Sequence, residues 1–434
     1  MLPWERCGAA LCLLALILTG GCRSIQAPGE VKASPELLQQ AQDYLYSDDQ
    51  EASRLLPVLL NRSIEEMESV LGRVLNESFQ KSPPTGRLPS QTIRVGDGER
   101  NYGLYVPVTY DSSRRYPLII CLHGAGFDGD TYLDRWQSRL EESYILACPS
   151  LEDGAWWSRE GEELVLALLS KVSREYHIDS DRIFLSGMSN GGIGTFLIGL
   201  NHPDRFAALI PMAAVLPKAL FPLLDNAKNT PFYLIHGAQD QVMTVRYSRD
   251  VTAYLEEKGY EVVYREHEHI HPIAGGHFFP KEELPDLLEW LKSRNRQPVP
   301  QELVVVRDRD HSGRDYWMRI EEISPETGSF WASEFDPDEE QRLQQGAYAR
   351  ISAKVSGNTF FVTSERVARL SLLLNRELVD FNKPVRVVIN GETRFEGQVK
   401  PDARTLLEET RRRPDLRQPV LGTVEIRIAP EAEP

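Results

Sequence analysis

Cysteine and excess basic charge are both scarce in this chain. It has five cysteines among 434 residues, three of them within the first 22, which is too few for a scaffold held by disulfides. Lysine and arginine number 49 against 64 aspartates and glutamates, which gives a formal net charge of −15. Because phosphate contacts need clustered basic side chains, this balance argues against a nucleic-acid partner and favours an uncharged or locally cationic ligand.

The overall composition is that of a folded, soluble protein. Hydrophobic residues make up 41% of the chain and charged residues 26%, which excludes a disordered, a collagenous or a polytopic membrane protein. At about 150 residues per domain, this length predicts two or three domains.

The first 22 residues have the order of an export signal. Arg6 precedes an apolar run over residues 7–19, and small residues then lead to Cys22. The run is too short for a spanning helix. The small residues before Cys22 resemble a bacterial lipoprotein box, although Leu18 lies one position further from the cysteine than that pattern prefers. We expect residues 1–21 to be a signal peptide and Cys22 to carry a lipid anchor that attaches the protein to a membrane, with a plain cleaved signal or an uncleaved anchor as alternatives.

The two remaining cysteines, Cys121 and Cys148, each end an apolar run that resembles a strand. We interpret both as buried thiols, although export would also allow a bridge between them.

Two regions with different periodicity follow the signal. Residues 22–90 form a polar tether and then show helical spacing, which predicts a helical arm packed against the next domain. Residues 91–296 alternate amphipathic helical stretches with short runs that predict strands, at 102–108, 117–122, 144–149, 182–186, 208–211, 231–236 and 261–266. This alternation predicts an α/β fold with a doubly wound, mostly parallel sheet, whose chemistry lies at the carboxyl ends of the strands.

The last region, residues 301–434, alternates like strands with one helix over 404–413, and we predict an accessory domain resembling a β-sandwich. It could bind polysaccharide through Tyr316, Trp317 and Trp331, or pack on the preceding domain, which we favour. We interpret the three arginines at the end of its helix as solvated.

A G-x-S-x-G motif at residues 187–191 directly follows a predicted strand and precedes a helical stretch. Its glycines permit a sharp turn that holds the hydroxyl of Ser189 in a cleft, beside the positive end of the helix. We predict that Ser189 is a nucleophile.

A serine nucleophile needs a base, and the base needs a carboxylate that orients it. Asp240 follows a predicted late strand and is our candidate for the acid, because Asp225 and Asp250 are less favourably placed. His277 follows a Gly-Gly turn and precedes the last helix of this region, so we expect it to be the base, with His271 as the alternative.

His267, His269 and His271 alternate, and in an extended segment they would share one face as metal ligands do. No cysteine or clear carboxylate completes such a site, and we therefore expect no metal and no cofactor.

Backbone amides would bind the oxyanion that forms during acyl transfer. Residues 123–126, His-Gly-Ala-Gly, follow a predicted strand, and we expect the amides of Ala125 and Asn190 to be the donors. We interpret His123 as a structural hydrogen-bonding residue.

These motifs together resemble an α/β-hydrolase over residues 91–296. Within that superfamily the chain resembles secreted esterases grouped with polyhydroxybutyrate depolymerases, feruloyl esterases and acetyl xylan esterases, and also the phospholipase/carboxylesterase group. The resemblance implies metal-free ester hydrolysis through an acyl-enzyme on Ser189, with His277 as base and then acid and Asp240 as its partner.

Three aromatic residues are candidates for substrate binding. Trp156 and Trp157 follow a predicted strand on the sheet end that carries Ser189, and Phe127 could narrow the pocket. The tryptophans could stack on a sugar or phenolic ring, or cover the rim of the core, and the sequence supports both readings.

The sequence thus favours an exported serine esterase whose substrate is an ester, with a carbohydrate-linked, phenolic or small acyl group. A serine peptidase of the same fold and a non-catalytic binding lipoprotein are the alternatives.

Overall fold

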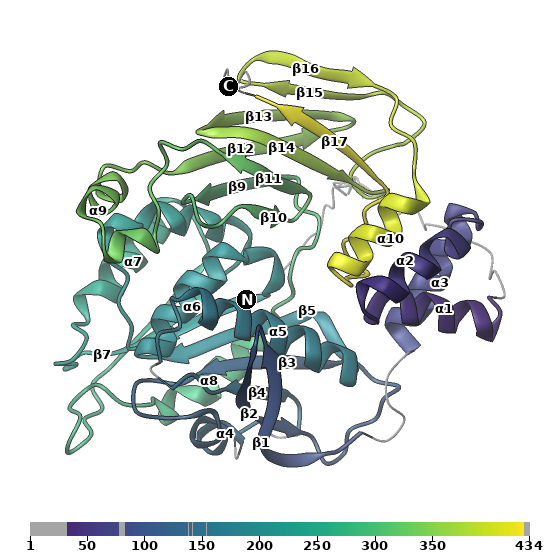
Figure 1. The fold of residues 1–434 in the computed structure, drawn as a ribbon. Coiled ribbons are helices and arrows are strands. Elements are labelled where there is room, and N and C mark those ends of the chain that lie inside the picture. The colour runs from purple at the N-terminus through teal and green to yellow at the C-terminus, as the bar shows by residue number, and fades with distance from the viewer. Residues whose placement is uncertain (1–32, 78–82, 138, 141, 153, 429–434) are drawn as a thin grey trace, which may run out of the picture.

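A computed structural model describes residues 33–77, 83–137, 139–140, 142–152 and 154–428. It shows a helical arm, a large sheet covered by helices, and a C-terminal pair of sheets (Figure 1). The signal segment and Cys22 lie outside the described residues. Among the described residues, no helix has both the length and the apolar character needed to cross a bilayer.

The helical arm consists of α1 (Pro35–Tyr46), α2 (Asp49–Leu59) and α3 (Ile64–Glu77). Ser34 caps α1 by accepting a hydrogen bond from the Leu37 amide at 3.2 Å, with a proline in the first turn, as the sequence predicts. The apolar faces of the three helices form one cluster. That cluster also contains leucines of the C-terminal region, namely Leu406, Leu407 and Leu421.

The arm therefore does not pack mainly on the domain that follows it, as we expected from the sequence. It lies against α10 (Ala403–Arg412), as Figure 1 shows, more than 300 residues further along the chain. Periodicity identifies an apolar helix face but carries no information about which distant element covers it.

The central sheet has eight strands in the order β1-β2-β4-β3-β5-β6-β7-β8. Their bounds are Gly86–Val95, Gly98–Val106, Ile145–Pro149, Tyr116–Leu122, Ile178–Met188, Ala208–Met212, Phe232–Gly237 and Val262–His267 in that order. The six strands from β4 to β8 run parallel, while β1 and β2 pair antiparallel at one edge. The predicted mostly parallel sheet is confirmed.

Helices cover both faces of this sheet. The apolar cluster on one face contains side chains of α5 (Arg159–Glu175), α6 (Asn190–Asn201) and α7 (Arg246–Glu257). The cluster on the other face contains side chains of α4 (Gly129–Gln137) and α8 (Leu284–Leu291). We call residues from β1 to α8 the α/β region.

Three short 3₁₀ helices complete the α/β region: η1 (Pro203–Arg205), η2 (Lys218–Asn229) and η3 (Lys281–Glu283). Both cysteines of this region are free and buried, as predicted. The Cys121 sulfur accepts a hydrogen bond from Trp136 Nε1 at 2.9 Å, and burial raises the pKa of the Cys148 thiol well above its ordinary value.

Strand β1 was not predicted. It lies at the sheet edge, and Ile93 is its single buried residue. An edge strand with so little buried surface lacks the apolar alternation that identifies a strand in a sequence.

Two further sheets form the C-terminal β region, which we define as β9 to β17. One sheet has the order β10-β11-β14-β17 and the other β16-β15-β13-β12-β9, with a shared apolar core between them. The bounds are Glu302–Arg307, Gly313–Asp315, Met318–Ile323, Ala349–Ser356, Thr359–Glu365, Val367–Leu374, Val385–Ile389, Glu392–Gly397 and Gly422–Arg427 for β9 to β17. The predicted additional sheets and the helix α10 are present.

Two helical elements of the C-terminal β region were not predicted, η4 (Ala332–Glu334) and α9 (Pro337–Gln344). α9 buries only Glu339 and Leu343, so it has almost no apolar stripe.

The aromatic residues considered for polysaccharide binding pack inside the protein instead. Tyr316 and Trp317 are buried. Trp331 donates from Nε1 to the Trp157 carbonyl at 3.3 Å and lies beneath the guanidinium of Arg159. The alternative that we favoured, packing on the preceding region, applies to all three.

Candidate active site

Ser189 occupies a sharp turn between β5 and α6. Its backbone has φ 57° and ψ −122°, a strained conformation for a residue with a side chain. A Cβ at Gly187 would lie 2.2 Å from the Gly191 carbonyl oxygen, and one at Gly191 would lie 2.1 Å from the Leu122 carbonyl oxygen. Only glycine fits on either side of Ser189, which explains the motif.

The structure brings Ser189, His277 and Asp240 together from three separate loops. His277 Nε2 lies 3.0 Å from Ser189 Oγ, and His277 Nδ1 lies 2.7 Å from Asp240 Oδ2. Asp240 follows β7, and His277 lies between β8 and α8. A hydrogen-bonded chain of hydroxyl, imidazole and carboxylate can activate the hydroxyl as a nucleophile.

The alternative residues are not part of this chain. Asp225 pairs with Lys258 and with Arg350, and Asp250 pairs with Lys218. The ring of His271 is exposed, and its Nδ1 accepts from the backbone of its own turn.

A close backbone contact positions His277. A Cβ on Gly276 would lie 2.5 Å from the Asp240 nitrogen, and one on Gly237 would lie 2.3 Å from the Gly276 carbonyl oxygen. The turn before His277 therefore rests directly on the exit of β7. This contact fixes the distance between the imidazole and Asp240.

Asp240 is buried but well provided with donors. Its Oδ1 accepts from the amides of Val242 and Met243, each at 2.8 Å. His236 Nε2 lies 3.3 Å from its Oδ2. Burial raises the pKa of Asp240, but hydrogen bonds from His236 and His277 outweigh it and hold the pKa well below its ordinary value.

His236 was missed as a site residue by the sequence argument. Its Nε2 also donates to the Met243 carbonyl at 2.8 Å, and its Nδ1 contacts Ser248 Oγ at 2.7 Å. The only available signal was its place four residues before Asp240, on the same strand exit.

The loop after β3 lies beside Ser189. A Cβ at Gly124 would be 3.3 Å from Ser189 Cβ. His123 holds this loop, because its Nε2 accepts from the Leu151 amide at 3.0 Å and its Nδ1 donates to the Gly124 carbonyl at 2.9 Å. Burial lowers the pKa of His123, in keeping with the structural role that we predicted for it.

Ala125 and Asn190 are adjacent across this loop. A Cβ at Gly154 would lie 3.7 Å from Ala125 Cα and 3.5 Å from Asn190 Nδ2. Asn190 is the first residue of α6, where backbone amides have no acceptor within the helix. Ala125 is exposed next to it.

The three aromatic candidates occupy different environments. Trp156 is fully buried and donates from Nε1 to the His123 carbonyl at 2.8 Å. The prediction that it stacks on substrate is therefore wrong, because the loop folds inward and Trp156 covers the core. Trp157 is half-buried and packs against the same core.

Phe127 is 44% exposed and lies two residues after Ala125. The Arg135 guanidinium lies 4.4 Å from its ring centroid. Of the three aromatic candidates, Phe127 alone has a largely accessible ring near Ser189. Sequence reasoning did not identify Arg135, which has no distinguishing motif.

The histidines considered as metal ligands diverge. His267 is buried, whereas His269 is exposed and lies 3.8 Å from Glu283. In the parts of the chain that the structure describes, no group of three or more His, Cys, Asp or Glu residues is placed to hold a metal ion.

Comparisons with known proteins agree with this architecture. The phospholipase/carboxylesterase family model matches residues 158–294. A probable feruloyl esterase C of Aspergillus terreus is 29% identical over 188 residues, which are 40% of this chain and 68% of that protein. A bifunctional acetylxylan esterase/xylanase of Neocallimastix patriciarum is 25% identical over 186 residues, 40% of this chain and 26% of its relative.

A more distant similarity is to dipeptidyl-peptidase 5 of Porphyromonas gingivalis, 27% identical over 126 residues, 25% of this chain and 18% of that protein. The chain spans 68% and 63% of two of the feruloyl esterases that it matches. The matched segments all belong to proteins or families named as hydrolases, and the sheet has the strand order described above. The chain therefore contains an α/β-hydrolase domain similar to feruloyl esterases and to the phospholipase/carboxylesterase family, and these similarities support a carboxylic ester hydrolase.

Proposed function

We propose that this protein is an exported serine esterase that works through an acyl-enzyme on Ser189. The observation that supports this most is the continuous chain from Ser189 Oγ through His277 to Asp240, at 3.0 and 2.7 Å. His277 Nε2 accepts the Ser189 proton as Oγ attacks the ester carbonyl. Asp240 holds the Nδ1–H and stabilises the imidazolium that forms.

The amides of Ala125 and Asn190 then bind the oxyanion, and the N-terminus of α6 adds its partial positive charge. His277 returns its proton to the leaving alcohol, which leaves the acyl group on Ser189. Water attacks this acyl-enzyme with His277 again as base, and the acid is released.

We propose carbohydrate-linked, phenolic or small acyl esters as substrates. The names of the feruloyl and acetylxylan esterases support this class. The exposed ring of Phe127, close to Ala125, is suited to contact an aromatic acyl group.

The first test is hydrolysis of p-nitrophenyl acetate, butyrate and octanoate, methyl ferulate and a peptide anilide, by wild type and by Ser189→Ala. We expect ester turnover in the wild type and a loss of at least about 10³-fold in the variant. Ser293→Ala is the matched control, because Ser293 is an exposed serine on a distant helix end. Equal rates in wild type and Ser189→Ala would contradict the proposal.

The same panel separates the alternatives. The similarity to a dipeptidyl-peptidase gives a specific reason to include the anilide, and faster anilide than ester turnover would favour a serine peptidase. No turnover of any member by a folded wild type would favour a non-catalytic binding lipoprotein.

We propose further that Cys22, which lies outside the described residues, is acylated after removal of residues 1–21 and anchors the protein to a membrane. In cells fed a radiolabelled fatty acid, we expect label in the wild type and none in Cys22→Ser, and we expect the variant to leave the membrane fraction. Label retained in Cys22→Ser would contradict a lipoprotein anchor.

A further inference from the structure

A cavity of about 220 Å³ lies between the α/β region and the C-terminal β region. The helix α6 begins beside Ser189 and ends at Asn201, which lines this cavity. At 1.5 Å per residue these two ends are ~17 Å apart, so the cavity is distinct from the candidate active site.

Arginine dominates the lining of this interface cavity. The lining contains three acidic residues, Glu162, Asp310 and Glu409. Its arginines are Arg205, Arg307, Arg314, Arg319, Arg412 and Arg413. This local excess of positive charge stands in a chain whose net charge is −15.

Four of these arginines have carboxylate partners. The pairs are Arg307–Asp315, Arg413–Asp204, Arg319–Glu409 and Arg412–Glu409. Arg413 is thus buried and paired, which corrects our prediction that the arginines ending α10 are all solvated. Sequence could not show this, because Asp204 lies in a distant loop.

The acidic lining residues are engaged elsewhere as well. Glu162 lies 3.0 Å from His202 Nε2 and 3.2 Å from His311 Nε2. Asp310 accepts hydrogen bonds from Ser329 Oγ at 2.9 Å and from the Trp331 amide at 2.8 Å. The lining therefore has no carboxylate left for another arginine.

Arg205 and Arg314 remain without a carboxylate partner. Arg314 donates only to the backbone carbonyls of Tyr316 and Gln418, each at 3.0 Å. Within the described part of the chain, the side chain of Arg205 makes no hydrogen bond and no ion pair. Burial, followed by the positive charge of Arg413, lowers the pKa of both guanidinium groups to about 9.

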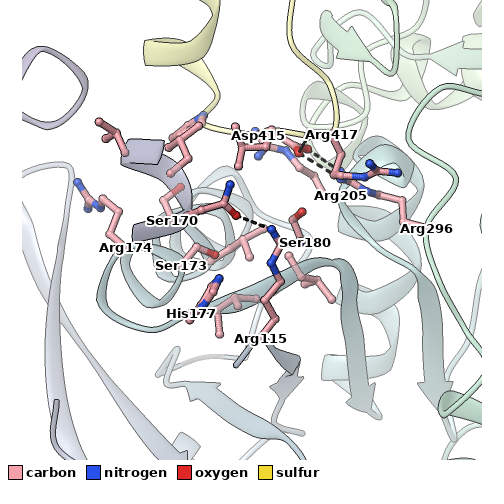
Figure 2. A pocket seen from close by; sticks show the side chains of 18 of the residues that line it. Arg115, Ser170, Ser173, Arg174, His177, Ser180, Arg205, Arg296, Asp415 and Arg417 are labelled. Atoms are coloured by element: carbon pink, nitrogen blue, oxygen red, sulfur yellow. Dashed lines mark hydrogen bonds and ion pairs between the residues drawn. The ribbon is translucent and has the colours of Figure 1, made fainter. Parts of the chain in front are cut away.

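Arg205 also lines a neighbouring cavity of about 130 Å³, shown in Figure 2. The buried arginine there, Arg296, binds Asp181 and Asp415, and Arg417 binds Asp181. Because those charges are compensated, the neighbouring cavity has less need of an anion than the interface cavity.

Guanidinium groups that are buried without a counter-charge are unfavourable, and an oxyanion would satisfy them through charge-assisted hydrogen bonds. Arg205 ends η1 of the α/β region, and Arg314 lies in β10 of the C-terminal β region. A bound anion would therefore connect the two regions. We propose that the interface cavity binds a small oxyanion, a phosphate or carboxylate group, between Arg205 and Arg314.

The test is thermal unfolding of the full chain in sodium chloride, phosphate, sulfate or glucuronate at one ionic strength. We expect a saturable rise in Tm of roughly 2–4 °C with at least one oxyanion over chloride. A response to phosphate or sulfate would identify an inorganic oxyanion, and a response to glucuronate alone would identify the carboxylate of a sugar acid. A response to none of the oxyanions would overturn the proposal.

Two variants locate the effect, Arg205→Met and Arg314→Met, with folding checked by near-UV circular dichroism. In chloride we expect each to be at least as stable as the wild type, because each removes an uncompensated charge. In the effective oxyanion we expect the Tm rise to be lost, whereas Arg404→Met, which removes an exposed arginine paired with Glu408, should keep it. A full Tm response in both cavity variants, or variants that unfold in chloride alone, would overturn the assignment.

Discussion

The strain at Ser189 and the donors around Asp240 serve the same geometry. Positive φ at Ser189 places Oγ 3.0 Å from His277 Nε2, while two backbone amides and two histidines surround the Asp240 carboxylate. Because Asp240 already has four donors, it can remain ionised although it is buried. Its charge is then available when His277 becomes positive.

At this scale we predict that Asp240→Asn lowers kcat by on the order of 10³–10⁴, because the amide no longer stabilises the imidazolium or fixes its tautomer. Ester hydrolysis by the purified variant measures the loss. The matched control is Asp250→Asn, since Asp250 lies on α7 and pairs with Lys218. A variant of Asp240 that kept wild-type kcat would remove it from the mechanism.

The low pKa of Asp240 also makes a contribution to stability that depends on pH. A carboxyl whose folded pKa lies below the unfolded value of about 3.9 stabilises the fold above that value, and the contribution is lost as the pH falls further. The free energy of unfolding of Asp240→Asn should therefore vary less than that of wild type below about pH 4.

At the scale of elements, the contacts between the α/β region and the C-terminal β region depend on a buried chain of charged groups. His311 Nδ1 contacts Asp308 at 2.8 Å and its Nε2 contacts Glu162 at 3.2 Å. Burial lowers the pKa of His311, but the two carboxylates outweigh this and raise it to about 10. Burial lowers the pKa of His202, on the other side of Glu162.

We predict that this chain weakens in alkali. Because the folded pKa of His311 is raised, its stabilisation is complete below the unfolded pKa of about 6.5 and is lost as the pH rises through about 10. Urea unfolding should show a decrease on the order of a few kcal/mol over this range in the wild type. The decrease should be smaller in His311→Gln and unchanged in His269→Gln, an exposed histidine near Glu283. Equal pH dependence in all three would contradict the role of His311.

At the scale of the whole molecule, the chain closes on itself, because the first helices pack on the last one (Figure 1). Leu407 of α10 is fully buried among side chains of the arm. Arg411 donates to the carbonyls at the end of α1, at Tyr44 and Ser47. The arm is therefore held by the C-terminal β region rather than acting as a free spacer.

We predict that Leu407→Ala destabilises the protein by about 2–4 kcal/mol and loosens the arm selectively, because it leaves a cavity between α10 and the arm. Hydrogen exchange should become faster in α1 to α3 while ester turnover is unchanged. Leu372→Ala is the control, since Leu372 is fully buried inside the two-sheet core, and it should not accelerate the arm in preference to its own sheets. Uniform acceleration in both variants would contradict this coupling.

The sequence was informative where chemistry depends on local geometry or on strand order. The turn at Ser189 is encoded by two glycines, and Asp240 and His277 follow strands whose ends meet at one sheet edge. Trp156 was misassigned because a loop tryptophan that folds inward has the same sequence context as one that faces solvent. The edge strand β1, the arm on α10 and the pairing of Arg413 depend on distant partners, which a single sequence does not specify.

The last turn of α6 has a consequence for the size of this enzyme. Arg307 donates to the carbonyls of Leu200 and Asn201, and Asn226 donates to the carbonyls of Leu200 and Val306. The helix that begins at the nucleophile is thus capped at its far end by a residue of β9. Proteolysis at residues 297–300 with loss of everything downstream would leave these carbonyls without that cap and Arg296 without Asp415. A hydrolase of the same fold that consists of the α/β region alone must satisfy the end of this helix with a group of its own.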